Sequence, residues 1–243
     1  MAPGRLTIAI ATDRRRTLSA RFAALSRAER EYARRLPTAR QRHFALGRLA
    51  AHAAVRRVLN GAVASTAIEV VNGLRREPLV RVNGTASDVS VSIAHSGRLG
   101  AACAWRNARG GCDAAGIDVE QIRANQVFEN SYAFSRREQE LLAGIPEGVE
   151  IAGLAAWTVK EAVWKALGAD DHIGPEAIDL RSLDLGRGCA RVEVRYRLKT
   201  LSRGRPIHVG CKILQMSDGA YALSIAQVGE PETACFAGDV VRG

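Results

Sequence analysis

The spacing of hydrophobic residues predicts a strand and then two helices in the first quarter of the chain. Leu6 to Ala11 is a short apolar run typical of a strand. Ser26-Arg-Ala-Glu29 has the form of a capping box, and we expect the helix that it opens to reach about Leu36. From Ala39 to Leu59 the apolar residues recur at helical spacing, and the pair Asn60-Gly61 is a typical helix end.

Short apolar segments separated by turn residues then predict strands, a second group of helices, and strands again. The first strands expected are Ile68–Val71, Leu79–Val82, Val89–Ala94, Gly100–Trp105 and Ile117–Glu120. Helices are expected from Phe134-Ser135-Arg-Arg-Glu138 onward and over Ala155–Leu167, followed by strands Val192–Leu198, His208–Leu214 and Tyr221–Ala226.

This order suggests that one pattern occurs twice. The helix end Arg-Arg-Val-Leu-Asn60-Gly is similar to Trp-Lys-Ala-Leu-Gly168, and Val91-Ser-Ile-Ala94 recurs as Leu223-Ser-Ile-Ala226. We therefore predict an α+β fold of two similar halves, each a helix packed on an antiparallel sheet, with residues 1–112 and 113–243 as the halves. A ligand cleft is expected at their junction.

Composition and charge limit the class of protein. The chain has 243 residues, 47% hydrophobic residues and a formal net charge of +10, with arginines concentrated in the first helices. We expect no signal peptide and no membrane span, and hence a cytoplasmic protein. The charge favours an anionic partner: a nucleic acid, a phosphorylated cofactor or an acidic protein. Five cysteines without metal-ligand spacing argue for reduced thiols and against a zinc site.

Two short patterns bring carboxylates and a lysine to common faces. Residues two apart in a strand point to the same side, so Asp118 and Glu120 share a face. Residues four apart in a helix stack, so Glu161 and Lys165 share another. Carboxylate oxygens are the ligands that Mg²⁺ prefers, and an ammonium suits a phosphate ester. Each pair alone is also common as surface decoration, but together they predict a site for Mg²⁺ or Mn²⁺ and a phosphate.

These residues resemble the signature of the 4′-phosphopantetheinyl transferases, specifically the larger, pseudodimeric type that activates synthetases such as surfactin synthetase. Gly116-Ile-Asp118-Val-Glu120 is similar to the first metal motif of the family. Trp157-Thr-Val-Lys160-Glu161-Ala-Val-Trp-Lys165 is similar to its Trp-x-x-Lys-Glu-Ala/Ser-x-x-Lys signature. The resemblance runs from about Leu25 to Ala226, and it implies Asp118, Glu120 and Glu161 as metal ligands.

The resemblance also implies a site for coenzyme A in the first half. Val91-Ser92-Ile-Ala-His95 is similar to a strand motif whose histidine contacts the 3′-phosphate of coenzyme A. The helix segment from Arg42 to Arg48 matches the arginine-bearing helix of the family. The cofactor-binding residues implied are Arg42, Arg48, Arg75, Arg76, Ser92, His95 and Lys165.

Two positions depart from the family pattern. Ala94 stands where the family usually has a serine, so one hydroxyl contact to the nucleotide is expected to be missing. Arg76-Glu77-Pro78 replaces a usual Gly-Lys-Pro. Either Arg75 or Arg76 supplies the charge instead, or the segment is a simple solvated loop.

The reaction implied is Mg²⁺-dependent transfer of 4′-phosphopantetheine from coenzyme A to a serine of an apo carrier protein, which releases adenosine 3′,5′-bisphosphate. Glu161 is the favoured base, with Glu120 and Glu138 as alternatives, and Lys165 stabilises the departing phosphate. The acidic carrier is expected to dock between Gln121 and Glu138, steered by the positive charge. Two halves in one chain make a monomer the expected state.

Two other functions remain open at this point. The arginine-rich helices are also typical of a nucleic-acid-binding protein, although this leaves the carboxylates of Asp118, Glu120 and Glu161 unexplained. The departures at Ala94 and Glu77 are compatible with a homologue that binds coenzyme A without catalysis.

Overall fold

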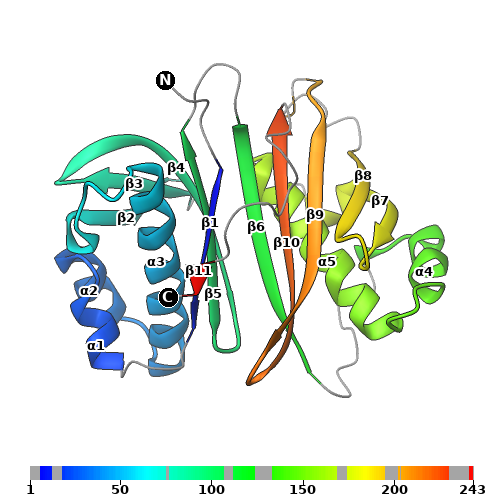
Figure 1. Ribbon diagram of the computed structural model, residues 1–243, viewed down its shortest axis with the longest axis horizontal. Coiled ribbons are helices and arrows are strands. Elements are labelled where there is room, and N and C mark those ends of the chain that lie inside the picture. The colour runs from blue at the N-terminus through cyan, green and yellow to red at the C-terminus, as the bar shows by residue number, and fades with distance from the viewer. Residues whose placement is uncertain are drawn as a thin grey trace. The chain divides into compact units, whose positions relative to one another are not determined.

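In a computed structural model of the chain, the described residues are 6–12, 18–74, 77–106, 112–123, 133–168, 174–194, 202, 204–229 and 241–242. They form two compact units (Figure 1), one of Met1–Cys112 with Ala237–Gly243 and one of Asp113–Phe236. We call them the N-terminal half and the C-terminal half. The predicted division placed residues 237–243 in the second half, but they cluster with the first because β11 (Val241–Arg242) pairs with β1 (Thr7–Thr12).

In its described residues the N-terminal half contains three α-helices and a six-stranded sheet in the order β11-β1-β5-β4-β3-β2. Neighbouring strands run antiparallel, apart from the parallel pair of β1 and β11. The remaining elements are α1 (Leu18–Ala23), α2 (Arg27–Arg34), α3 (Thr38–Val58), η1 (Ser65–Ala67), β2 (Ile68–Asn72), β3 (Pro78–Val82), β4 (Thr85–Ser96) and β5 (Leu99–Arg106).

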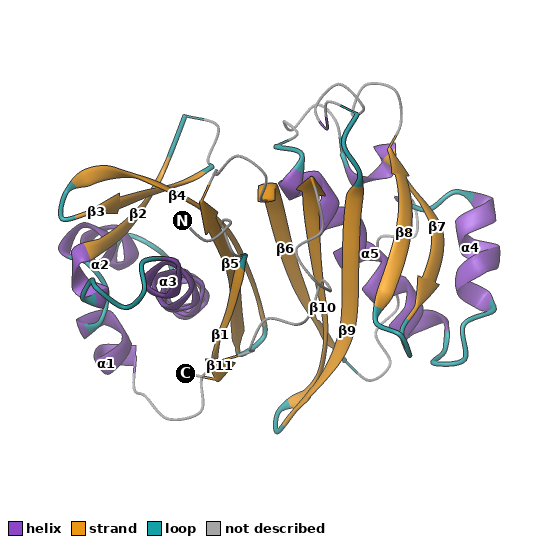
Figure 2. Ribbon diagram, turned by 45° about the horizontal axis from the view of Figure 1, so that its top comes forward, coloured by secondary structure: helices purple, strands orange, loops and turns teal. Residues whose placement is uncertain are grey.

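Where the structure describes it, the C-terminal half contains two α-helices and a five-stranded sheet in the order β6-β10-β9-β8-β7. Figure 2 shows α5 lying against one face of this sheet. The elements are β6 (Cys112–Ile122), α4 (Arg136–Ala143), α5 (Val149–Ala166), η3 (Pro175–Ala177), β7 (Ile178–Asp184), β8 (Cys189–Val194), β9 (Ile207–Met216) and β10 (Gly219–Gly229).

The two halves repeat one topology, which confirms the predicted α+β fold. In each, the first strand lies beside the last strand of an antiparallel four-stranded meander, and a short helix and a long helix lie between them in the chain. The predicted echo of Val91–Ala94 in Leu223–Ala226 is a coincidence, however. The first segment lies in β4, whereas the second lies in β10, whose counterpart in strand order is β5.

Each long helix packs tightly on its sheet because a strand residue opposite it has no side chain. A Cβ added at Gly100 on β5 would collide with the backbone of Leu46 and Gly47 in α3. A Cβ at Gly116 on β6 would likewise collide with the backbone of Ala162 and Ala166 in α5. Buried alanines and branched residues fill the remaining contacts, so each half has its own apolar core.

A buried charge pair ties α4 to α5 and β7 in the C-terminal half. Ser135 caps α4, and Glu138 completes the capping box. The Glu138 carboxylate, 2% exposed, also lies 2.8 Å from Lys160 Nζ and accepts a hydrogen bond of 2.7 Å from the Leu180 N–H. We call Ser135, Glu138, Lys160 and Leu180 the α4 clamp.

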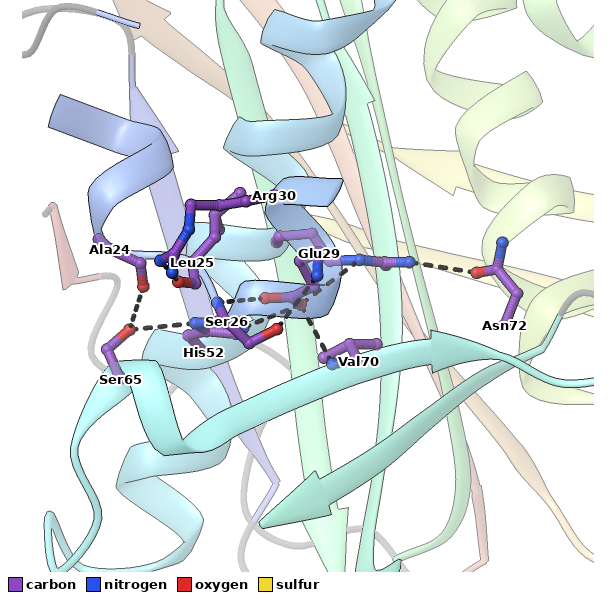
Figure 3. A network of polar contacts seen from close by, with 10 residues as sticks. Ala24, Leu25, Ser26, Glu29, Arg30, His52, Ser65, Val70 and Asn72 are labelled. Carbon is purple, nitrogen blue, oxygen red and sulfur yellow. Dashed lines mark hydrogen bonds and ion pairs between the residues drawn. The ribbon is translucent and has the colours of Figure 1, made fainter. Parts of the chain in front are cut away.

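The same device holds α2 in the N-terminal half (Figure 3). Ser26 and Glu29 form the capping box, and Glu29 is 2% exposed. Its Oε1 lies 3.0 Å from His52 Nε2 and accepts a hydrogen bond of 3.1 Å from the Val70 N–H. We call Ser26, Glu29, His52 and Val70 the α2 clamp.

The sequence patterns predicted most of the longer elements. Helix α1 and strands β7 and β11 were missed, α5 begins at Val149 rather than at Ala155, and β6 begins at Cys112 rather than at Ile117. The predicted strand Val192–Leu198 lies partly in β8 and partly outside the described residues. Within the described part of the chain, no helix combines the length and the hydropathy that a membrane span requires.

Candidate active site

The predicted strand and helix motifs meet in the C-terminal half. Lys165 Nζ on α5 lies 2.6 Å from Asp118 Oδ1 on β6, and it also donates to the Ile117 carbonyl at 3.4 Å. The side chain of Asp118 is 8% exposed and that of Lys165 is 24% exposed. Gly116 allows this approach, because its Cα faces the last turns of α5. The geometry thus joins a carboxylate and an ammonium at the strand–helix contact.

The protonation behaviour of this pair follows from its burial. Burial raises the pKa of Asp118, and the Lys165 ammonium opposes that rise. Burial alone would lower the pKa of Lys165, but the charge and hydrogen bond of Asp118 outweigh it and raise that pKa. Asp118 Oδ2 is buried and has no hydrogen-bond partner in the structure. It is an oxygen that another cation could use.

Glu161 belongs to the same cluster. Its pKa is raised by burial and by the charges of Asp118 and Glu120, with Lys165 acting in the opposite direction. Glu120 also raises the pKa of Lys165, which places it within electrostatic range of both helix residues. The structure therefore brings together all four residues predicted for the metal and phosphate side.

These four side chains do not form a complete set of metal ligands. Among the described residues, no group of three His, Cys, Asp or Glu side chains is close enough together to hold a metal ion. The donor chemistry nevertheless fits Mg²⁺, since the cluster offers carboxylate oxygens and Asp118 Oδ2 lacks a hydrogen-bond partner. At present Lys165 supplies the positive charge beside Asp118.

Glu138, an alternative base in the sequence analysis, belongs to the α4 clamp rather than to this cluster. Burial would raise its pKa, but hydrogen bonds from Lys160, Leu180 and Ser135 outweigh burial and lower it. Lys160, the lysine before Glu161 in the signature, is fully buried and also donates to the Ala133 carbonyl at 2.7 Å. Both residues are committed to holding the fold, which disfavours Glu138 as a base.

A cluster of basic side chains lies in the N-terminal half, around the turn between β4 and β5. The rings of His43 and His95 stack with centroids 5.1 Å apart, and His43 Nε2 donates to the Gly97 carbonyl at 3.0 Å. The pKa of Arg21 is lowered by burial and by the charges of Arg42 and Arg98. Three arginines and two histidines therefore share one neighbourhood, which favours an anionic ligand.

The other residues predicted for coenzyme A have different positions. Arg48 is 9% exposed, with Nη2 donating to Asn72 Oδ1 at 3.1 Å and Nε 3.7 Å from Glu29 Oε1. These contacts join it to the α2 clamp and indicate a structural role. His95 faces α3, since a Cβ at Gly47 would meet it, so by strand alternation Ser92 faces the opposite side of the sheet. Arg75 and Arg76 lie outside the described residues.

Sequence reasoning missed Arg21, His43 and Arg98, and it did not recognise the two clamps. A signal for the clamps is present in the sequence. Ser26-Arg-Ala-Glu29-Arg-Glu31 recurs as Ser135-Arg-Arg-Glu138-Gln-Glu140, which is a closer repeat than either segment used to infer the two halves. No comparable signal marks Arg21, because only the packing of α1 brings it to Arg42 and Arg98.

Comparisons with known proteins find a family similar to the C-terminal half. Residues 114–226 match the model of the ACPS family, described as the 4′-phosphopantetheinyl transferase superfamily. A search of curated proteins finds no match.

Among solved structures, an apo-ACPS structure from Chronobacterium ammoniagenes is 18% identical, with a TM-score of 0.33 over 48% of this chain and 96% of that one. An ACPS–CoA complex from the same organism is 20% identical, with a TM-score of 0.32 over 48% of this chain and 98% of that one. The family match spans β6 and α5, with Asp118, Glu120, Glu161 and Lys165. Residues 114–226, which hold these four residues, are thus similar to the 4′-phosphopantetheinyl transferase superfamily.

Proposed function

We propose that this protein transfers the 4′-phosphopantetheine group of coenzyme A to a serine of an apo acyl or peptidyl carrier protein, in a reaction that depends on Mg²⁺. The observation that carries the proposal is the meeting of Asp118, Lys165 and Glu161 at the strand–helix contact, inside the segment that matches the superfamily. The repeated topology of the halves supports the larger, pseudodimeric type of transferase.

In this reaction the serine oxygen forms a bond to the phosphorus that carries the pantetheine arm. The bond between the two phosphates breaks, and adenosine 3′,5′-bisphosphate leaves. Asp118, Glu120 and Glu161 would hold Mg²⁺, which neutralises charge on the diphosphate when bound. Glu161 accepts the serine proton. Lys165 donates a hydrogen bond to the departing phosphate.

The basic cluster in the N-terminal half supports a role in holding the nucleotide. His95 and Arg42 were predicted to face coenzyme A, and Arg21, His43 and Arg98 add to the positive charge around them. A phosphomonoester is doubly charged near neutral pH, so such a cluster suits the 3′-phosphate of coenzyme A. The overall charge of +10 favours association with an acidic carrier protein.

A labelling assay tests this function directly. The protein is mixed with a fluorescent coenzyme A analogue and a panel of apo carrier proteins from fatty acid, polyketide and nonribosomal peptide synthesis, with Mg²⁺ or with EDTA. We expect Mg²⁺-dependent labelling of at least one carrier, and loss of labelling when the carrier serine is replaced by alanine. Absence of labelling with every carrier, together with salt-sensitive binding to DNA, would instead support a nucleic-acid-binding protein.

A further inference from the structure

We propose that the α4 clamp is a positioning device for Glu161: Glu138 and Lys160 fix the rotation of α5 about its axis and thereby direct the Glu161 carboxylate toward Asp118. The inference rests on the proposed function, in which Glu161 is the base. It assigns a role to Lys160 and Glu138, neither of which contacts the reacting groups. Both act through the helix that carries Glu161.

The clamp contacts α5 at Lys160, the residue next to Glu161. The Lys160 side chain is fully buried, and its Nζ lies 2.8 Å from Glu138 Oε1 and 2.7 Å from the Ala133 carbonyl. The same Nζ lies 4.7 Å from the centroid of the Phe134 ring. Three contacts from the segment that starts α4 therefore hold one atom of α5. This atom cannot shift without leaving a buried charge unpaired, which is costly.

Glu138 is itself fixed and cannot follow a movement of Lys160. Its two oxygens accept hydrogen bonds from the backbone N–H of Ser135 at 2.7 Å and from that of Leu180 at 2.7 Å. One bond comes from the start of α4 and the other from β7 in the sheet. The clamp thus connects α5 to the sheet through two rigid elements.

The rotation of α5 matters because consecutive helix residues point about 100° apart. When Lys160 points into the clamp, the direction of Glu161 is set. A rotation of about 20° at a side-chain radius of about 6 Å moves a carboxylate by about 2 Å. Misplacing a catalytic group by about 1 Å can cost a factor of about 10² in rate. Small rotations of α5 would therefore be enough to impair the base.

The opposite side of α5 is fixed by β6, so Glu161 lies between two anchors. Lys165 bonds to Asp118 and to the Ile117 carbonyl, and Gly116 lets the helix backbone approach the strand. The β6 anchor includes members of the reacting cluster, whereas the α4 clamp does not. Variants of the clamp can therefore separate positioning from chemistry.

The α2 clamp supplies a matched control. It has the same construction, but its residue on the long helix is not followed by a carboxylate residue. Ser65 Oγ lies 3.0 Å from His52 Nδ1 and donates to the Ala24 carbonyl at 3.3 Å. His52 Nε2 donates to Glu29 Oε1 at 3.0 Å. In both clamps a side chain of the long helix thus contacts a buried carboxylate, but the residue after His52 is Ala53.

The experiment compares Glu138→Gln with Glu29→Gln in the full chain. We measure the thermal unfolding midpoint, kcat and KM for coenzyme A, and Mn²⁺ affinity by electron paramagnetic resonance, at a temperature where all variants are folded. Both variants are expected to lower the midpoint. Only Glu138→Gln is expected to lower kcat, by about 10- to 100-fold, and to weaken Mn²⁺ binding, by about 10-fold, with KM nearly unchanged.

Equal kcat and equal Mn²⁺ affinity in the two variants would overturn the inference, because the α4 clamp would then only stabilise the fold. If Glu138→Gln does not fold, the double variant Glu138→Gln/Lys160→Met removes the unpaired lysine charge, and the same kinetic loss is expected. A wild-type protein that neither labels a carrier nor binds Mn²⁺ would contradict the proposed function. An active wild type with a fully active clamp variant contradicts only the inference.

Discussion

The two halves of this protein share a scaffold but differ at the positions that carry the chemistry. Arg57 Nη1 on α3 donates to the Ile8 carbonyl at 3.4 Å, as Lys165 Nζ on α5 donates to the Ile117 carbonyl at 3.4 Å. Aligning the halves on these bonds and on the clamps pairs each carboxylate of the candidate active site with an alanine. The pairs are Asp118 with Ala9, Glu120 with Ala11, and Glu161 with Ala53.

The comparison separates what the fold requires from what the reaction requires. Both halves have a capping serine, a buried glutamate and a side chain of the long helix that contacts that glutamate. Each half also has a glycine where helix meets strand, on β5 in one half and on β6 in the other. Only the C-terminal half adds the carboxylates. The N-terminal half instead has its cationic cluster at the β4–β5 turn. In the proposed function, the repeated scaffold holds a metal and a base in the C-terminal half and an anion in the N-terminal half.

The largest difference between the halves is expected at Glu161 and its counterpart Ala53. Glu161→Gln should lower the rate of carrier labelling by about 10²- to 10⁴-fold, because it removes the group that accepts the serine proton. Initial rates with saturating coenzyme A measure the loss. The control Ala53→Glu should neither restore labelling to Glu161→Gln nor add a Mn²⁺ site, since Ala9 and Ala11 supply no partner oxygens. Labelling at the wild-type rate by Glu161→Gln would refute this assignment.

The second comparison concerns the cation at the strand–helix contact. Lys165→Met should lower the free energy of unfolding by about 3 kcal/mol, because it leaves the buried Asp118 without its partner. Arg57→Met should cost less than about 1 kcal/mol, since Arg57 donates to the Ile8 carbonyl and the residue in the place of Asp118 is Ala9.

Urea denaturation, with hydrogen exchange to follow each half, measures both changes. Adding Asp118→Asn to Lys165→Met should recover part of the lost stability. Equal losses for Lys165→Met and Arg57→Met would mean that Asp118 contributes nothing to the difference.

The glycines where helix meets strand, Gly100 and Gly116, provide a third comparison. Substituting either one should lower the free energy of unfolding by a similar amount. Gly116→Ala and Gly100→Ala each place a methyl group against helix backbone, and each should cost about 1–3 kcal/mol. Only Gly116→Ala should also slow carrier labelling, because α5 carries Glu161 and Lys165. Thermal unfolding and labelling rates test both statements. Wild-type stability of Gly116→Ala would show that α5 can move away without cost.

The fourth comparison concerns low pH, where the stabilising contributions of Glu29 and Glu138 should change in the same direction. The pKa values of Glu29 and Glu138 are lowered in the folded state, so each carboxylate contributes stability above the ordinary glutamate pKa of about 4.3. That stability is lost as pH falls through the folded pKa. Glu29→Gln and Glu138→Gln should therefore be less stable than wild type at pH 7, with the gap closing in acid. A gap that widens in acid would contradict this linkage.

Much of the architecture was predictable because local signals agreed with the final packing. The capping box at Ser26 and the apolar spacing of α3 placed those helices almost to the residue. Helix α1 and strand β7 were missed, because each is short and its few apolar residues form no clear pattern until their packing neighbours are known. The early start of α5 at Val149 follows a glycine with positive φ, Gly148, which the periodicity did not mark.

The candidate site was predictable where chemistry follows spacing along one element. Asp118 and Glu120 on a strand, and Glu161 and Lys165 on a helix, were identified from spacing alone, and the family resemblance joined them. Spacing did not predict the contacts of Arg48, because its guanidinium lies beside Glu29 and Asn72, which are far from it in sequence. The presence of a basic residue in a helix does not show whether it will pair with a buried acidic residue in the fold.

Strand β11 has a consequence for how the protein is made. It lies at the edge of the N-terminal sheet beside β1, so the first strand of the chain gains its second neighbour from residues 241–242. During synthesis on the ribosome, β1 therefore keeps an open edge until those residues emerge. Exposed strand edges recruit other strands. Nascent chains interrupted before residue 241 should consequently be more prone to associate with one another than finished ones.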